Sequence, residues 1–315
     1  MPEAVARTRA VNSAAAARPG RRRISRGSLS KSALLFAVPA VALYVFVLLI
    51  PTARGTVFAF TNWDGLSQTF DVIGFKNFAS IFANADSVKA IVNTLLIAAV
   101  TTIAANAIGL ALALALNSRI KSRNALRVFF FAPAVLTPVV TAYLFQYIFA
   151  PLGPLNSVFD AAGLPFLKQD WLGNGNLALM AIMIVIIWQQ SGYTMVIYLA
   201  GLQGVPAELL EAAAVDGANS MHRFWSITRP LLAPAITVSV MLSLIHGLKV
   251  FAEVWVMTGG GPGNATNTLS TLIYKNAFQY GLFGSSIAMA LVLLVFVALI
   301  SAIQYRALLS QGGNR

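Results

Sequence analysis

The chain of 315 residues has no cysteine and very few charged residues. The absence of cysteine excludes disulfide bonds and metal sites with thiolate ligands. Charged residues make up 10% of the chain, whereas soluble domains average about 25%. Hydrophobic residues make up 58%, and the mean hydropathy is +0.75. This composition excludes an ordinary soluble domain and indicates a protein that crosses the membrane several times.

Motifs of enzymes are also missing. No Gly-x-x-x-x-Gly-Lys-Ser/Thr sequence occurs, and no glycine is followed directly by lysine, so the phosphate-binding loop of an ATPase is absent. The chain has only two histidines, and no convergent carboxylates or histidine cluster within the apolar segments indicates a catalytic or metal site. We therefore expect no catalytic residue, metal or cofactor in this chain. If ATP drives transport here, ATP and Mg²⁺ bind to a separate ATPase chain.

The net charge of +12 is concentrated near the N-terminus. Eight of the 22 lysines and arginines lie within the first 31 residues, beside a single acid, Glu3. Because no basic face alternates with aromatic residues that could stack on bases, nucleic acid is not an expected partner. Residues 1–32 have few large apolar side chains, which predicts a disordered basic tail. An organellar transit peptide is the alternative.

Six apolar stretches are each long enough to cross a bilayer as a helix, which takes about 20 residues. We therefore predict an all-α integral membrane protein with six transmembrane helices. Pro133 and Pro138, in the third stretch, are expected to be tolerable kinks within one helix. The predicted helices cover residues 33–53, 90–117, 128–150, 177–202, 231–256 and 285–305. The predicted divisions are the tail at 1–32, a first helix with an outer loop at 33–87, a core at 88–306 and a short tail at 307–315.

The connecting segments favour one orientation. The N-terminal tail, the 118–127 loop, the 203–230 loop and the C-terminal tail together hold 16 lysines and arginines, and the remaining loops hold five. Cytoplasmic loops carry the excess of these residues. Both termini and the 203–230 loop are therefore predicted to be cytoplasmic.

The 203–230 loop has the pattern of two short helices. Pro206 suits a first helical turn, and the leucines and alanines that follow recur at helical spacing beside acidic residues. Gly217 fits the left-handed residue that ends a helix. Asn219 or Ser220 can cap a second helix, which Pro230 is expected to end. Such a hairpin can also lie on a membrane surface without any partner.

Glu211-Ala212-Ala213, followed by Gly217, Ile227 and Pro230, resembles the EAA loop of ABC importer permeases. The resemblance implies a cytoplasmic coupling helix that docks into a groove of the ATPase subunit. The usual ending is Ile-x-Leu-Pro, and this chain has Arg229 at the leucine position. The residues assigned to coupling are Glu211, Ala212, Ala213, Gly217, Arg223, Ile227 and Pro230.

Three further segments are similar to the carbohydrate and glycerol-3-phosphate branch of these permeases. They are FTNWDG at 60–65, ALRVFFFAPAVLTPVV at 125–140 and FAEVWVMTGGGPGNATNTLSTLIYKNAF at 251–278. The glycines at 259–263 lie on the wrong side of the membrane for ATP, so they are expected only to permit unusual backbone angles. The resemblance covers about residues 88–306 and implies a type I (MetI-like) permease core in a bacterial or archaeal cytoplasmic membrane. It also implies a second, similar permease, two ATPase copies and an extracytoplasmic solute-binding protein as partners.

Polar side chains in the fourth and fifth stretches are candidates for the substrate path. Gln189 and Gln190 lie at bilayer depth beside Tyr193, and buried amides need hydrogen-bond partners from a neighbouring helix or a polar substrate. Amides with aromatic rings suit a sugar, because amides bond hydroxyls and rings pack on the apolar sugar face. The fifth stretch adds residues that share one face at helical spacing. The candidates are Gln189, Gln190, Tyr193, Ser243, His246 and Val250, with ordinary interhelical hydrogen bonding as the alternative.

Lys249 and Glu253 are the only charges inside the fifth stretch. Being four residues apart, they share a face of a helix and can pair. Charges at this depth are costly unless they pair or face water. We interpret them either as a structural ion pair near the outer interface or as part of the substrate path or gate. Because Lys249 is the only deep cation, the pattern favours a neutral sugar over a phosphorylated one.

The predicted function is that of a permease subunit of an ATP-driven importer, which moves a disaccharide, oligosaccharide or related solute inward by alternating access. The alternative is a self-sufficient, ion-coupled transporter. That alternative needs an ion relay within the spans, for which only Lys249 and Glu253 are available, and no internal repeat supports it.

Overall fold

The computed structural model describes residues 31–118 and 120–312. The predicted basic tail at 1–32 lies outside the described residues except for its last two, and residues 119 and 313–315 also lie outside them. The described chain is helical, with a single isolated β-bridge between Thr61 and Val72. It divides into two compact units, which meet in sequence between Ala53 and Arg54.

The first unit contains the predicted first span. Helix α2 (Lys31–Tyr44) continues through a π-helical turn, η1 (Val45–Leu49), into α3 (Ile50–Phe58). The apolar segment Phe36–Phe58 has 23 residues and a mean hydropathy of 2.2, which is enough to cross a bilayer as a helix.

Three other helices are long and apolar enough to span a membrane. They match the predicted second, fourth and sixth stretches within a few residues at most ends. They are α5 (Ala85–Leu116), α9 (Gly175–Gln203) and α16 (Phe283–Gly312), whose apolar part is Phe283–Arg306. Helix α16 therefore extends into the segment predicted as a C-terminal tail from residue 307.

The third predicted span is not one kinked helix. Helix α6 (Arg123–Val135) and helix α7 (Pro138–Ile148) are bent by 96° relative to each other. Proline disfavours a helical conformation for the residue before it, and Thr137 is extended and caps α7 by accepting a hydrogen bond from the Val140 amide. The expectation that Pro138 only kinks the helix was wrong. The bend leaves the Leu136 carbonyl free to accept a bond from a side chain.

The fifth predicted span is also broken. Three residues, 249–251, separate helix α13 (Ala233–Leu248) from helix α14 (Ala252–Thr258). The Val250 carbonyl, which a continuous helix would bond to a later amide, accepts a hydrogen bond from the Thr268 hydroxyl at 3.1 Å. Irregular backbone at membrane depth is tolerated where such groups are satisfied or line a cavity. Residue 250 therefore lies in a helix break that the segment between α14 and α15 supports.

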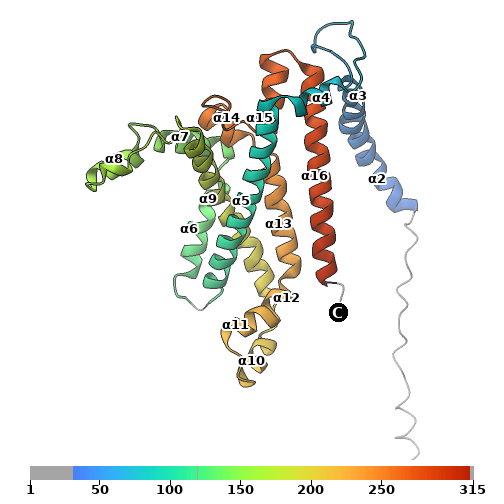
Figure 1. Ribbon diagram of the computed structural model, residues 1–315. Coiled ribbons are helices and arrows are strands. Elements are labelled where there is room, and N and C mark those ends of the chain that lie inside the picture. Colours follow the sequence, from blue (N-terminus) through green and yellow to red (C-terminus); the bar gives the residue numbers. More distant parts are fainter. Residues whose placement is uncertain (1–30, 119, 313–315) are drawn as a thin grey trace, which may run out of the picture. The chain divides into compact units, whose positions relative to one another are not determined.

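Within the second unit, α5, α9, α13 and α16 run side by side in Figure 1. One end of this bundle carries α4 (Lys76–Ala83), α14, α15 (Leu269–Tyr274) and its π-helical continuation η4 (Lys275–Gln279). Helix α8 (Pro154–Ala161) and the 3-10 turn η2 (Pro165–Leu167) follow α7 at the same end. The opposite end carries the chain between α9 and α13, the loop before α6 and the end of α16. Within the second unit, the described segments predicted to share one side of the membrane therefore share one end of the bundle.

Close helix contacts depend on glycine. A Cβ atom at Gly109 of α5 would overlap the side chain of Thr194 on α9. A Cβ atom at Gly247 of α13 would lie 2.7 Å from the Ala98 Cα of α5. Small residues let helix backbones approach closely in membranes, where packing rather than hydrophobic burial drives association.

The loop between α3 and α4 is organised by the segment FTNWDG. The ring of Trp63 stacks on Phe58 with centroids 4.3 Å apart and also contacts Phe283 at 5.8 Å. Gly65 has a φ of +86°, and a Cβ there would overlap Phe283. Asp64 accepts bonds from the Ser67 hydroxyl and from nearby amides, which lowers the pKa of this exposed carboxyl to about 2.

One buried amide joins three helices. Asn106 of α5 donates to the Ser243 hydroxyl of α13 at 3.1 Å and to the Thr102 carbonyl at 2.8 Å. Its Oδ1 accepts from the Tyr198 hydroxyl of α9 at 2.8 Å and from the Ser239 hydroxyl at 2.7 Å. All the polar side chains in this set are buried. Asn106 thus satisfies its own hydrogen-bonding groups and fixes the relative positions of α5, α9 and α13.

We expect Asn106→Leu to destabilise the folded protein by about 2–4 kcal/mol, because three buried hydroxyls lose a partner at about 1–3 kcal/mol each, less any local rearrangement. Reversible unfolding of the purified protein in mixed micelles measures the difference. Asn117→Leu, at an exposed site near the end of the same helix, is the matched control. Equal stabilities for the two variants would show that Asn106 does not organise the bundle.

Candidate functional site

The chain between α9 and α13 forms an exposed hairpin, residues 207–231. Helix α10 (Ala207–Val215) carries Glu211, Ala212 and Ala213 and starts directly after Pro206. Gly217 has a φ of +81° and closes α10, since the amide of Ala218 bonds the Ala213 carbonyl at 2.9 Å. The prediction of a left-handed glycine at this position is confirmed.

The second arm of the hairpin is longer than predicted. Asn219 caps α11 (Ser220–Arg223) by accepting from the His222 amide at 2.8 Å. A π-helical turn, η3 (Phe224–Thr228), and a short α12 (Arg229–Leu231) continue the helix. The arm ends at Leu231, one residue after Pro230, where the helix was expected to end. Beyond Leu231 the arm meets α13 at a bend of 71°.

The hairpin exposes apolar side chains at the end of the bundle. Val215 is 89% exposed, Met221 66% and Trp225 54%. The guanidinium of Arg229 lies 5.2 Å from the centroid of the Trp225 ring, and the indole Nε1 of Trp225 donates to the sulfur of Met221 at 3.1 Å. Arg229, at the position where leucine is usual, thus holds the Trp225 ring by a cation–π contact.

Two adjoining cavities lie where the broken helices meet. The Glu253 cavity has a volume of about 440 Å³ and the Gln190 cavity about 330 Å³. Both fall near the lower end of the range for ligand pockets, about 300–1,000 Å³. They share Pro138, Leu242 and His246. The Glu253 cavity is further lined by Ile245, Lys249, Val250, Phe251, Ala252 and Glu253, and the Gln190 cavity by Ala134, Leu136, Ile186, Gln189, Gln190 and Tyr193.

The two glutamines of α9 differ in their hydrogen bonding. Gln189 donates from Nε2 to the free Leu136 carbonyl at 2.6 Å, so it compensates the break between α6 and α7. The Oε1 atom of Gln190 is buried and has no hydrogen-bond partner within the described part of the chain. Gln189 therefore makes an ordinary interhelical hydrogen bond. Gln190 keeps an acceptor that a polar substrate could use.

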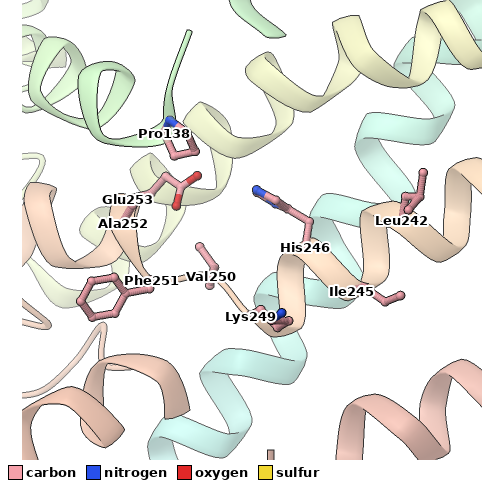
Figure 2. A pocket seen from close by; sticks show the side chains of 9 residues that line it. All are labelled: Pro138, Leu242, Ile245, His246, Lys249, Val250, Phe251, Ala252 and Glu253. Carbon is pink, nitrogen blue, oxygen red and sulfur yellow. The ribbon is translucent and has the colours of Figure 1, made fainter. Parts of the chain in front are cut away.

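The predicted pairing of Lys249 with Glu253 is wrong. The two residues belong to different helical segments, because α13 ends at Leu248 and α14 starts at Ala252. Among residues 31–118 and 120–312, the only ion pair joins Lys168 and Asp160. Glu253 is 2% exposed, and its Oε1 has no hydrogen-bond partner in the same described ranges. In Figure 2 its carboxylate and the imidazole of His246 point toward one another across the cavity.

Seven of the eight predicted substrate-path residues line the cavities, and Ser243 does not. Ser243 is 1% exposed, and its hydroxyl accepts a hydrogen bond from Asn106 of α5 instead of lining a cavity. Val250 lies beyond the end of α13, so the expected helical spacing holds for Ser243 and His246 but not for Val250. The seven lining residues are Gln189, Gln190, Tyr193, His246, Lys249, Val250 and Glu253.

Sequence reasoning missed three features of the site. Asn106 gave a signal, since an amide in a long apolar stretch needs partners. Pro138 and Leu136 were assigned to a continuous span, although proline already favours a helix boundary at the preceding residue. The support that Thr268 gives to the break at Val250 has no local signal, because the two residues are 18 apart in sequence.

Comparison with known proteins decides the family. The family described as "Binding-protein-dependent transport system inner membrane component" matches residues 105–308, which is more than half of the chain. The chain belongs to this family. It is therefore a multi-pass permease subunit of an ABC importer, a membrane component without enzymatic activity, and the ATPase is a separate subunit.

Relatives of this permease extend over most of its length. It is 35% identical to the multiple sugar-binding transport system permease protein MsmF of Streptococcus mutans, over 86% of this chain and 93% of that protein. It is 33% identical to a probable starch degradation products transport system permease protein, AmyD, of Thermoanaerobacterium thermosulfurigenes, over 86% and 91%. A crystal structure of a bacterial alginate ABC transporter, in complex with an alginate pentasaccharide-bound periplasmic protein, shares the fold. Its TM-score is 0.75 at 24% identity, over 88% of this chain and 94% of that one.

We expect Lys249 and Glu253 of the permease to act independently in stability, because no ion pair joins them. A double-mutant cycle with Lys249→Met and Glu253→Gln should give a coupling energy within about 0.5 kcal/mol of zero. Unfolding of the four proteins in mixed micelles gives this value. A coupling above about 1.5 kcal/mol would mean that the two charges pair in the membrane.

Proposed function

We propose that the permease carries a sugar inward by alternating access, driven by ATP hydrolysis on its partner subunits. The support for a sugar comes from two relatives, a multiple sugar-binding transport system permease and a probable permease for starch degradation products. The cavities agree with this substrate class, since they combine open amide and carboxylate acceptors with apolar walls.

The exposed hairpin is the observation that carries the coupling role. Its apolar side chains are exposed beyond the end of the bundle, and exposed apolar patches outside a membrane favour a protein partner. We assign the ATPase to this surface, with Glu211, Ala212, Ala213, Gly217, Arg223, Ile227 and Pro230 as the coupling residues. ATP and Mg²⁺ then bind to the partner ATPase.

The connectivity of the hairpin explains how a movement there reaches the substrate. Helix α9 leads directly into the hairpin, and the hairpin leads directly into α13. The same two helices line the cavities, through Gln190 and Tyr193 on α9 and through His246 on α13. A rigid displacement of the hairpin therefore moves two walls of the cavities together, which is the movement that alternating access requires.

The proposed assembly follows from the family and from charge. Transport in this family depends on a binding protein, and we place it at the end of the bundle that carries α14 and α15. A second, similar permease and an ATPase dimer complete the proposed complex. We place the hairpin and both termini in the cytoplasm of a bacterium or archaeon, since the basic residues gather on that side.

The proposal is tested by asking whether uptake depends on ATP or on an ion gradient. Wild-type and deletion strains are grown on a mixed polysaccharide hydrolysate, and mass spectrometry of the spent medium identifies the solutes that only the wild type removes. We expect uptake of those solutes to persist when ionophores dissipate ion gradients and cellular ATP is kept constant. Uptake that stops with the gradient while ATP remains would instead support a self-sufficient ion-coupled transporter.

A further inference from the structure

The Glu253 carboxylate is a polar group built into a cavity wall without a protein partner. It is 2% exposed, its Oε1 has no hydrogen-bond partner among the described residues, and it points into the cavity in Figure 2. Buried polar atoms are nearly always hydrogen-bonded, and each exception calls for an explanation such as an absent ligand. A ligand that donates a hydrogen bond would supply the missing partner.

The adjoining cavity also contains a buried acceptor that lacks a hydrogen-bond donor within residues 31–118 and 120–312. The Gln190 Oε1 is also buried and without a partner in the described ranges, and it too is an acceptor. A hydroxyl group donates a hydrogen bond, whereas ionised carboxylate, sulfate and phosphate groups only accept. Two open acceptors in adjoining cavities therefore match a ligand with several hydroxyls.

The buried position of Glu253 disfavours an anionic ligand in this cavity. An anionic ligand would lie beside a buried carboxylate, where like charges repel strongly because the local dielectric constant is low. Lys249 lines the same cavity but is exposed, so solvent screens its charge far more than the charge of the buried Glu253. The remaining wall of the cavity, apart from His246, is apolar.

We propose that Glu253 sets the charge selectivity of the permease: its free oxygen accepts a hydroxyl of an uncharged sugar, and its charge rejects acidic and phosphorylated sugars. The inference rests on the proposed function as a sugar importer. It identifies a specificity-determining residue, with the Gln190 amide as a second acceptor for the same class of ligand.

The wild-type protein gives the first test. The hydrolysate contains digests of starch and cellulose as sources of neutral sugars, and of pectin and alginate as sources of uronates, with sugar phosphates added. We expect every solute that depends on the permease to be uncharged. If removal of a uronate or a sugar phosphate requires the permease, the role of Glu253 is overturned, whereas the proposed function as a sugar importer still stands. No dependent solute at all would overturn the proposed function and this inference with it.

Variants give the second test. Glu253→Gln keeps the shape and one acceptor but removes the charge, so the uptake of the uronate form relative to the neutral form of the identified sugar should rise at least about tenfold. Asp170→Asn removes an exposed charge from the outer loop and should leave this ratio within about twofold. An unchanged ratio in a normally expressed Glu253→Gln permease contradicts the proposal.

A third variant keeps the test decisive if Glu253→Gln fails to reach the membrane. Gln190→Met preserves the length of the side chain and removes the open acceptor, so the half-saturating concentration of the neutral sugar should rise about fivefold or more, with charge selectivity unchanged. An unaltered half-saturating concentration would show that the open acceptors do not bind the sugar.

Discussion

Gly217→Pro is expected to reduce solute uptake at least about hundredfold while leaving the membrane bundle folded. Gly217 has a φ of +81°, and its amide donates to the Ala214 carbonyl at 3.1 Å. Proline fixes φ near about −65° and has no amide hydrogen, so the end of α10 and the turn to α11 cannot keep their geometry. Uptake of the identified solute by cells, normalised to permease in the membrane, measures the effect.

Gly163 provides a matched control for this substitution. It has a φ of +70°, its amide bonds the Asp160 carbonyl at 3.0 Å, and the next amide, of Leu164, bonds the Phe159 carbonyl at 2.8 Å. The same helix-ending motif thus occurs after α8, at the opposite end of the bundle. We expect Gly163→Pro to retain the ATPase on purification and Gly217→Pro to lose it. Full uptake by Gly217→Pro would remove the hairpin from the mechanism.

The second large effect is expected from Gly109→Ala, which should destabilise the bundle by about 2–3 kcal/mol. The added Cβ would overlap the Thr194 side chain and lie 2.9 Å from the backbone nitrogen of Met195. Because backbone atoms are involved, α5 and α9 must move apart. Unfolding of the purified protein in mixed micelles, compared with wild type, gives the loss of stability.

Gly55→Ala makes the same chemical change in a helix where, apart from the helix's own backbone and the adjacent residues, no described atom lies within 4 Å of the new Cβ. Alanine is a better helix former than glycine by about 1 kcal/mol, so this variant should be as stable as wild type or slightly more so. Equal destabilisation by the two substitutions would mean that the α5–α9 contact does not depend on Gly109.

The long helices could be predicted because bilayer thickness sets their length. Residues 90–117 and 177–202 correspond to α5 and α9, with ends that differ by a few residues. The hairpin was predictable for a different reason, because local turn chemistry at Gly217 and Asn219 specifies its geometry. Both signals are contained in short windows of sequence.

The breaks could not be predicted in the same way, since hydropathy is averaged over whole spans. A helix can stop inside the membrane only where other groups satisfy its free carbonyls, and here Gln189 serves Leu136 and Thr268 serves Val250. These partners are distant in sequence. The assumption of an unbroken fifth helix produced the mistaken ion pair, and the break is what leaves Glu253 open to a ligand.

Purification of the tagged chain from its native membrane tests the central claim most directly. The account predicts that a second multi-pass permease and an ABC ATPase co-elute, and that the ATPase is lost when Glu211 and Gly217 are both changed. A chain that elutes alone and still catalyses gradient-driven uptake after reconstitution would contradict it.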